Sequence, residues 1–173
     1  LKESAAKETS VNNNQDDALY SSNELVSGTD MFFDTVVTIT LYGEDKQSYI
    51  DECFRLAGYY EDLFSNTVPE SDISKINDAK GAYVQVSPET IDLLNAGLEY
   101  GEISDGQFNI SVGELSDLWH FSENDGDVPA DKEIQSALQT IESVPVSIED
   151  NTVALTNPDS KLDLGGIAKG YIA

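Results

Sequence analysis

Cysteine and histidine are almost absent from this sequence. Its 173 residues include one cysteine, Cys53, and one histidine, His120. A single cysteine excludes an internal disulfide, and so small a Cys and His content disfavours zinc sites built from these ligands. A bound metal would therefore be a hard cation such as Mg²⁺, held by oxygen atoms. Cys53 falls on the apolar face of a predicted helix, where we expect it to fill the core.

Basic residues are also scarce. Nine lysines and arginines stand against 33 aspartates and glutamates, which gives a formal net charge of −24. Binding to nucleic acid depends on Lys and Arg, so this balance argues against a nucleic-acid partner, and it disfavours anionic lipid as well. A protein this acidic can bind a phosphate ligand only through local groups that attract the anion. Such groups are backbone N–H groups, a lysine at the site or a divalent cation.

Long apolar runs are missing too. No stretch approaches the roughly 20 apolar residues that span a bilayer. Residues 1–27 are polar and contain few bulky apolar side chains, which predicts a disordered tether. Such a tether suits an exported protein held to a membrane by its N-terminus. A floppy terminus without that role is the alternative.

The rest of the chain alternates between strand and helix patterns. Period-two apolar patterns and β-branched residues predict strands at 31–41, 82–86, 144–148 and 153–155. Helical spacing predicts helices over about 46–64, 87–106 and 129–142, with a helical turn at 73–77. The last two strands read as a hairpin. The prediction is therefore an α+β fold with an antiparallel or mixed sheet, rather than a doubly wound parallel one.

The stretch from 161 to 171 carries the clearest functional pattern. It reads as a short strand, then Gly165 and Gly166, then the start of a helix that contains Lys169. Glycine allows close approach of backbone to a ligand, and a helix start directs N–H groups at an anion. The spacing matches neither the dinucleotide fingerprint nor the P-loop. Taken alone, a glycine pair after a strand is more typical of a tight turn.

The predicted helix after this glycine pair is very short. The sequence stops at Ala173, a few residues into that helix. A helix of this length buries little apolar surface. We therefore expect the 173 residues to be a piece of a longer protein.

Four segments, in order and in register, resemble the ApbE-like family of FAD:protein FMN transferases. They are 31–42 (MFFDTVVTITLY), 63–65 with 72–77 (LFS and DISKIN), 104–113 running into 118–119 (SDGQFNISVG and LW), and 163–171 (DLGGIAKGY). The resemblance implies a T-fold-type α+β domain, of which residues 28–173 would form the N-terminal part. It also implies an exported protein, often lipid-anchored, in agreement with the tether.

The resemblance implies a defined activity. Such enzymes bind FAD and Mg²⁺, transfer the FMN half to a threonine or serine hydroxyl of a target protein, and release AMP. The partners would then be FAD and an acceptor protein. Because the reaction is attack on a pyrophosphate phosphorus, catalysis would consist of positioning and of neutralising negative charge. A bridging Mg²⁺ would allow a strongly acidic protein to do this.

The resemblance also implies roles for individual residues. The implied FAD contacts are Met31, Thr67, Asn77, Gln107, Phe108, Asn109, Asp163 and Lys169. Ala168 would offer its carbonyl to Mg²⁺. The family usually has Asp in place of Asn109 and Gly in place of His120, and its side-chain metal ligands lie in a C-terminal half outside this sequence. We therefore expect these 173 residues alone to bind Mg²⁺ weakly and to catalyse poorly.

Several of these residues have a plain structural alternative. Met31 could belong to the core, and Asn77 could end a helix as a C-cap. Asp163 could cap its own turn, and Lys169 could be an ordinary surface residue of a helix.

The aromatic stretch 119–121 has a structural interpretation of its own. Trp119 and Phe121 are expected to pack, and His120 to lie on the surface. At the level of the whole protein, two alternatives to the enzyme remain open. One is a binding module that holds FAD without transferring it, and the other is a surface protein without a cofactor.

Overall fold

The computed structural model describes residues 25–119 and 128–173. The helices are α1 (Gln47–Phe64), α2 (Asp72–Asp78), α3 (Pro88–Ile103), α4 (Gly113–Asp117), α5 (Asp131–Leu138) and α6 (Ala168–Ile172). The strands are β1 (Leu25–Phe32), β2 (Thr35–Tyr42), β3 (Val84–Gln85), β4 (Val146–Glu149) and β5 (Thr152–Leu155). Both sheets are antiparallel, so the predicted α+β class is confirmed. Within the described residues, no helix combines the length and the apolar composition that crossing a bilayer requires.

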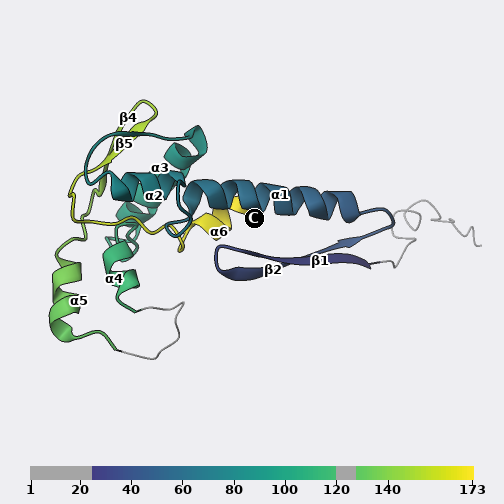
Figure 1. Ribbon diagram of the computed structural model, residues 1–173, viewed down its shortest axis with the longest axis horizontal. Coiled ribbons are helices and arrows are strands. Elements are labelled where there is room, and N and C mark those ends of the chain that lie inside the picture. Colours follow the sequence, from purple (N-terminus) through teal and green to yellow (C-terminus); the bar gives the residue numbers. More distant parts are fainter. Residues whose placement is uncertain (1–24, 120–127) are drawn as a thin grey trace, which may run out of the picture.

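The β1–β2 hairpin lies beneath the long helix α1 and extends away from the remaining elements (Figure 1). The prediction of one strand over 31–41 was wrong, because the chain reverses at Phe33 and Asp34. Both residues have positive φ, 51° and 52°, as a tight two-residue hairpin turn requires. β1 also begins at Leu25, so the tether boundary at residue 27 was placed too late. Residues 1–24 lie outside the described part of the chain.

One face of the hairpin packs on α1. Gly28 allows this close approach, because a Cβ atom there would lie 2.6 Å from Ile50 and 2.9 Å from the ring of Phe54. The rings of Phe32 and Phe54 add a contact at 5.8 Å. Cys53 is exposed, so the prediction that it fills the core was wrong. It directly precedes Phe54, and one helical step of 100° turns it away from the single face that the hairpin covers.

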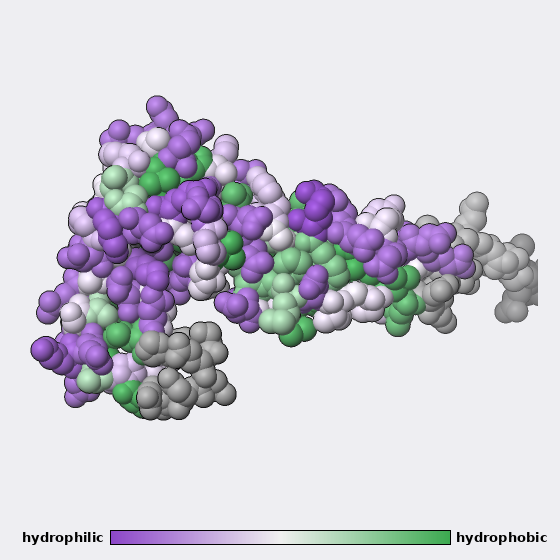
Figure 2. All heavy atoms as spheres, in the orientation of Figure 1, coloured by the Kyte–Doolittle hydropathy of each residue, from purple (hydrophilic) through white to green (hydrophobic). Residues whose placement is uncertain are grey.

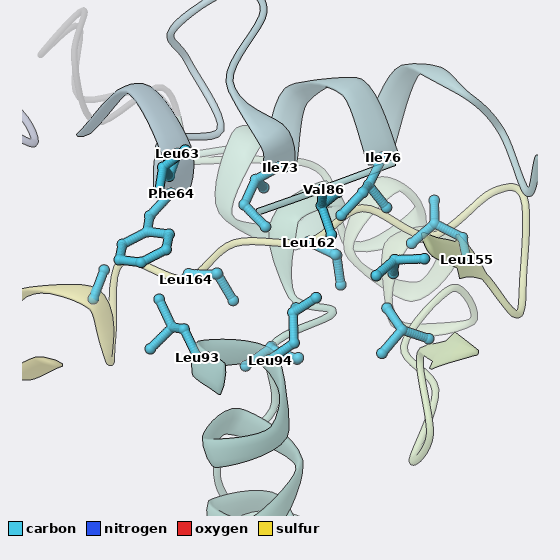
Figure 3. Close-up of a cluster of buried hydrophobic side chains, with 14 residues drawn as sticks. Leu63, Phe64, Ile73, Ile76, Val86, Leu93, Leu94, Leu155, Leu162 and Leu164 are labelled. Carbon is cyan, nitrogen blue, oxygen red and sulfur yellow. The ribbon is translucent and has the colours of Figure 1, made fainter. Parts of the chain in front are cut away.

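The core lies in the body beyond the hairpin, where a second sheet runs in the order β3-β5-β4. The hairpin predicted around 149–151 is confirmed as β4 and β5. Figure 3 shows the buried cluster, which draws on helices, strands and the connections between them. Its members are Leu63, Phe64, Ile73, Ile76, Val86, Leu93, Leu94, Ile110, Val146, Val153, Leu155, Leu162, Leu164 and Ala168. The terminal stretch thus contributes alternate leucines to the core, as its pattern predicted.

The start of α3 depends on a side chain from another helix. Pro88 is the first helical residue, as predicted, but the side chain of Ser87 makes no capping hydrogen bond. Instead the buried Asp72 of α2 accepts from Ser87 N and from Thr90 Oγ1, both at 2.8 Å. This carboxylate satisfies an N–H group at the helix start and joins α2 to α3.

Several other predicted boundaries differ from the structure. α3 ends at Ile103 rather than Gly106, and α5 covers only the middle of the helix predicted over 129–142. The terminal strand is reduced to one parallel bridge, between Val112 and Lys161.

Hydrophobic residues on the visible surface gather over the hairpin and α1, whereas the body is mostly hydrophilic (Figure 2).

Candidate functional site

Two segments far apart in the sequence lie side by side in the body. The N–H of Asp163 donates to the carbonyl of Ile110, and the N–H of Gly113 donates to the carbonyl of Lys161, both at 2.9 Å. The approach depends on glycine, because a Cβ atom at Gly113 would lie 2.7 Å from that Lys161 oxygen. The pairing places Phe108 near the glycine-rich turn after Asp163, so the structure brings together two of the sequence segments singled out above.

Asn77 holds the second of these segments from its other side. The side chain is buried, donates from Nδ2 to the carbonyl of Leu162 at 3.1 Å and accepts at Oδ1 from the N–H of Leu162 at 2.8 Å. The amide thus takes the place of a neighbouring strand residue. The C-cap of α2 is Ala79, so the C-cap alternative for Asn77 was wrong. Leu162 and Leu164 point into the core, and Asp163 between them is half-buried.

The turn after Asp163 uses only some of its N–H groups internally. Asp163 Oδ1 accepts from the N–H of Gly165 at 2.8 Å, so the capping role considered for this carboxylate is present. The N–H groups of Ile167 and Ala168 donate to the carbonyl of Leu164 at 2.9 Å and 2.8 Å. The expected cradle of free N–H groups is therefore smaller than the sequence predicted.

Other N–H groups of this turn remain open. Those of Gly166, Lys169 and Gly170 have no partner among the residues that the structure describes. The helix that follows, α6, has only five residues, so its dipole adds little positive potential. The ammonium of Lys169 is exposed and forms no ion pair within the described ranges. A ligand anion could meet both kinds of donor here.

A cavity of about 510 Å³ opens between the end of α3 and this turn. It is lined by Ala96, Tyr100, Ile103, Ser104, Phe108, Gly166, Ile167, Gly170 and Tyr171. Phe108 packs tightly on the glycine, since a Cβ atom at Gly166 would lie 3.1 Å from its ring. Tyr100 meets Phe108 edge to face at 6.3 Å. Aromatic and apolar walls with a few polar groups at the rim suit a planar ring.

Tyr171 lines the same cavity. Burial raises the pKa of its hydroxyl, and the negative charge of Asp92 raises that pKa further. The phenol therefore keeps its proton, and with it a hydrogen-bond donor, further into alkaline pH than an ordinary tyrosine does. Its ring is held edge to face against Tyr60 and Phe64 of α1, at 6.0 Å and 5.6 Å.

A second cavity, of about 840 Å³, lies between the end of α3 and the segment 141–145. Phe108 lines both cavities. The second one also has Glu99, Glu102, Asp105 and Glu142 in its lining, and these carboxylates would repel a phosphate. The smaller cavity has no carboxylate in its lining and is therefore the better candidate for a phosphorylated ligand.

The other predicted contacts lie elsewhere or are engaged. Met31 is 64% exposed on the outer face of the hairpin, so the alternative that it belongs to the core was wrong. Thr67 lies in the loop after α1, with its hydroxyl 3.0 Å from that of Ser65. Neither residue lines the smaller cavity. Gln107 is exposed, and the side chain of Asn109 bonds within the protein.

The aromatic stretch 119–121 is only partly described. Trp119 is 37% exposed. His120 and Phe121 lie outside the described residues. The cavity instead takes two aromatic walls that the sequence analysis missed, Tyr100 and Tyr171. Tyr171 had a usable signal, because it follows Gly170 within the glycine-rich stretch.

A magnesium site does not fit the described residues on their own. They contain no group of three or more His, Cys, Asp or Glu side chains that could hold a metal ion. Ala168, the predicted carbonyl ligand, is the buried first residue of α6. One carbonyl falls far short of the octahedral oxygen set that Mg²⁺ requires.

Fold and site together define an α+β domain with an aromatic cavity beside a glycine-rich turn. Comparison with known proteins identifies the family. The sequence model of the ApbE family matches residues 33–173, and the chain belongs to this family. The resemblance carried by the four segments is thereby confirmed.

The curated relatives carry the same activity in their names. The FAD:protein FMN transferase of Klebsiella pneumoniae strain 342 is 31% identical over 156 residues, which cover 88% of this chain and 49% of the relative. The FAD:protein FMN transferase of Treponema pallidum is 28% identical over 166 residues, covering 89% and 44%. The chain thus spans about half the length of the curated relatives it matches.

Solved structures show the same fold. The ApbE protein of Thermotoga maritima superposes with a TM-score of 0.78 at 32% identity, covering 86% of this chain and 50% of that one. The flavin transferase ApbE of Vibrio cholerae gives a TM-score of 0.77 at 24% identity, covering 86% and 50%. At that lower identity the likeness concerns the fold alone.

Proposed function

We propose that the protein is an FAD:protein FMN transferase and that this chain supplies a large part of its FAD site. Membership of the ApbE family and the names of the curated relatives support the activity. The single observation that carries the site is the pairing of Asp163 with Ile110 at 2.9 Å, because it places the aromatic cavity next to a turn with open N–H groups and Lys169.

The proposed reaction is a phosphoryl-type transfer of FMN. A threonine or serine hydroxyl of the acceptor protein attacks the phosphorus of the FMN half of FAD. A new P–O bond to the acceptor forms, the P–O bond to the AMP half breaks, the hydroxyl proton passes to a base, and AMP leaves. Negative charge grows on the phosphate oxygens, so neutralising groups contribute most to the rate.

Named residues have distinct parts in this proposal. Tyr100, Phe108 and Tyr171 hold a planar ring of FAD, and the remaining oxygen of Asp163 accepts a hydrogen bond from a hydroxyl or amine of the ligand. The ammonium of Lys169 and the open N–H groups of the turn face the diphosphate. Magnesium dependence belongs to the proposal for the full-length protein, since its ligands would come from outside the described residues, and no step above passes through it.

The setting of the reaction is also a proposal. An exported protein, anchored through a lipid at its N-terminus, would meet its acceptor on the outer side of the membrane. The polar composition of residues 1–24 supports this. Fractionation of cells with and without the region upstream of Leu25 tests it, and a protein that stays cytoplasmic in both cases would contradict it.

Intact mass spectrometry tests the activity. The full-length protein is incubated with FAD, Mg²⁺ and a candidate acceptor domain, and the acceptor should gain the mass of one FMN. Asp163→Ala and Lys169→Ala should slow transfer by about ten- to a hundredfold, since hydrogen bonds to charged groups are worth roughly 1.5–3 kcal/mol. Lys132→Ala, which removes an exposed lysine from α5, is the matched control. Normal transfer by both site variants would refute the site.

A binding module that holds FAD without transferring it is the second candidate. The aromatic cavity and the turn with open N–H groups account for binding of FAD without any transfer step, and this observation supports the second candidate. This candidate predicts a thermal shift and yellow colour with FAD, but no added mass on any acceptor. The same incubation therefore separates the two functions.

A further inference from the structure

The side chain of Asn109 is fully engaged inside the protein. Its Nδ2 donates to the carbonyl of Glu142 at 2.9 Å, and its Oδ1 accepts from the N–H and the hydroxyl of Ser111, both at 2.8 Å. The hydroxyl of Ser111 in turn accepts from the N–H of Glu142 at 3.1 Å. The same hydroxyl also lies 3.3 Å from the Glu142 carbonyl, so the side chains of Asn109 and Ser111 together hold both backbone polar groups of Glu142. We call these three residues the 109–142 brace.

The brace requires an amide at position 109. The carbonyl of Glu142 can only accept, and the N–H of Ser111 can only donate, so the side chain between them must offer one donor and one acceptor. Asparagine does so. An ionised aspartate has no donor, and it would place a carboxylate oxygen against the Glu142 carbonyl. The cost of such a mismatch is that of an unsatisfied polar group together with repulsion between the two oxygens.

The brace lies between neighbours that shape the candidate FAD site. Phe108, directly before it, lines both cavities and packs on Gly166. Ile110, directly after Asn109, accepts the hydrogen bond from Asp163. A shift of the backbone at 109 would therefore move the aromatic wall of the cavity and the carboxylate beside the turn together. Glu142 itself lies in the connection between α5 and β4, which lines the other cavity.

We propose that Asn109 is a positioning residue for FAD. Its side chain makes no contact with the nucleotide, and it fixes Phe108 and Asp163 by bonding to Ser111 and Glu142. This inference rests on the proposed function and adds to it a role for a residue that the resemblance presents as a direct FAD contact.

Two variants separate positioning from direct contact. Asn109→Asp removes the donor to Glu142. Ser111→Ala removes the hydroxyl that bonds to the backbone of Glu142. Because Ser111 is 0% exposed, its side chain can contact no ligand. Asn95→Asp adds the same charge at an exposed position of α3 and is the matched control. FAD affinity is measured by titration calorimetry on the full-length protein, with the melting temperature recorded for each variant.

Positioning predicts that Asn109→Asp and Ser111→Ala each weaken FAD binding by about tenfold, the scale of one mismatched buried hydrogen bond. Combined, they should weaken it little further, because residues of one network are not additive. In turnover, the KM for FAD should rise more than kcat falls. Asn95→Asp should bind like the wild type.

Three outcomes would overturn the inference. Weak binding by Asn109→Asp together with normal binding by Ser111→Ala would indicate direct contact. Lower melting temperatures with unchanged FAD affinity of the folded protein would indicate a purely structural brace. Normal FAD affinity in every variant would show that Asn109 has no role in FAD binding. If the wild type itself binds no FAD, the proposed function fails, which is a result distinct from all three.

Discussion

At the scale of single residues, the side chain of Asn77 forms the two backbone hydrogen bonds that a neighbouring strand would otherwise form. Its amide pairs with both backbone groups of Leu162, a residue 85 positions away in the sequence. Without that side chain, a buried N–H and a buried carbonyl would lose their partners. The direction of Asp163, the next residue, follows from this contact, so a side chain that need not touch the ligand helps to set the site.

Asn77→Ala should lower the free energy of unfolding by about 2–4 kcal/mol, since each buried polar group left unsatisfied costs roughly 1–3 kcal/mol. Urea denaturation of the full-length protein measures this. Asn95→Ala, on the exposed face of α3, serves as the control and should change stability by less than about 0.5 kcal/mol. Equal stabilities of the two variants would show that the Asn77 clamp is not needed.

At the scale of elements, local patterns predicted helices well and contacts poorly. α1 begins within a residue of its predicted start and ends where predicted, because its apolar residues recur at helical spacing over 18 positions. The reversal at Phe33–Asp34 had only a weak signal, since Asp takes positive φ more readily than most residues but Phe does not, and the turn contains neither Gly nor Asn. Its support is non-local: the N–H of Phe33 donates to Glu61 Oε1 at 2.6 Å.

In the candidate site, too, the segments could be predicted from the sequence but their contacts could not. The glycine-rich stretch and the segment around Phe108 could be selected from the sequence through a family resemblance. Their pairing, and the bond from Asn109 to Glu142, could not, because each depends on a partner more than 30 positions distant. The cavity wall at Tyr100 was missed for the same reason, since it becomes a wall only when α3 meets the turn at Gly166.

Gly113→Ala tests the pairing of these two segments. The new Cβ would lie 2.7 Å from the Lys161 carbonyl, so the segments must separate, and unfolding free energy should fall by about 1–3 kcal/mol. Gly170→Ala is the matched change, since a Cβ there has no heavy atom within 4 Å. It should raise stability by up to about 1 kcal/mol, because alanine favours a helix. Equal destabilisation of both variants would contradict the predicted role of the Gly113 contact.

At the scale of the whole molecule, negative charge dominates. The described residues form two ion pairs, Arg55 with Glu52 and Lys161 with Asp117, against a formal net charge of −24. Most carboxylates therefore repel one another. Repulsion of this kind opposes the compact state and falls as salt screens it.

Stability should therefore rise with salt. Between about 10 mM and 150 mM monovalent salt the Debye length falls from roughly 30 Å to roughly 8 Å. The melting temperature should increase by about 2–4 °C for each kcal/mol of repulsion removed. Scanning calorimetry in NaCl and in KCl measures this and separates screening from the binding of a specific ion. A constant or falling melting temperature would contradict the charge argument.

The central claim is that FAD binds where the segment around Phe108 meets the turn from Asp163 to Gly170. A crystal structure of the full-length protein with FAD tests it most directly. The account predicts a planar ring of the nucleotide against Phe108 and its diphosphate near Gly166 and Lys169. FAD bound elsewhere, with the turn at Gly165 remote from it, would contradict the account.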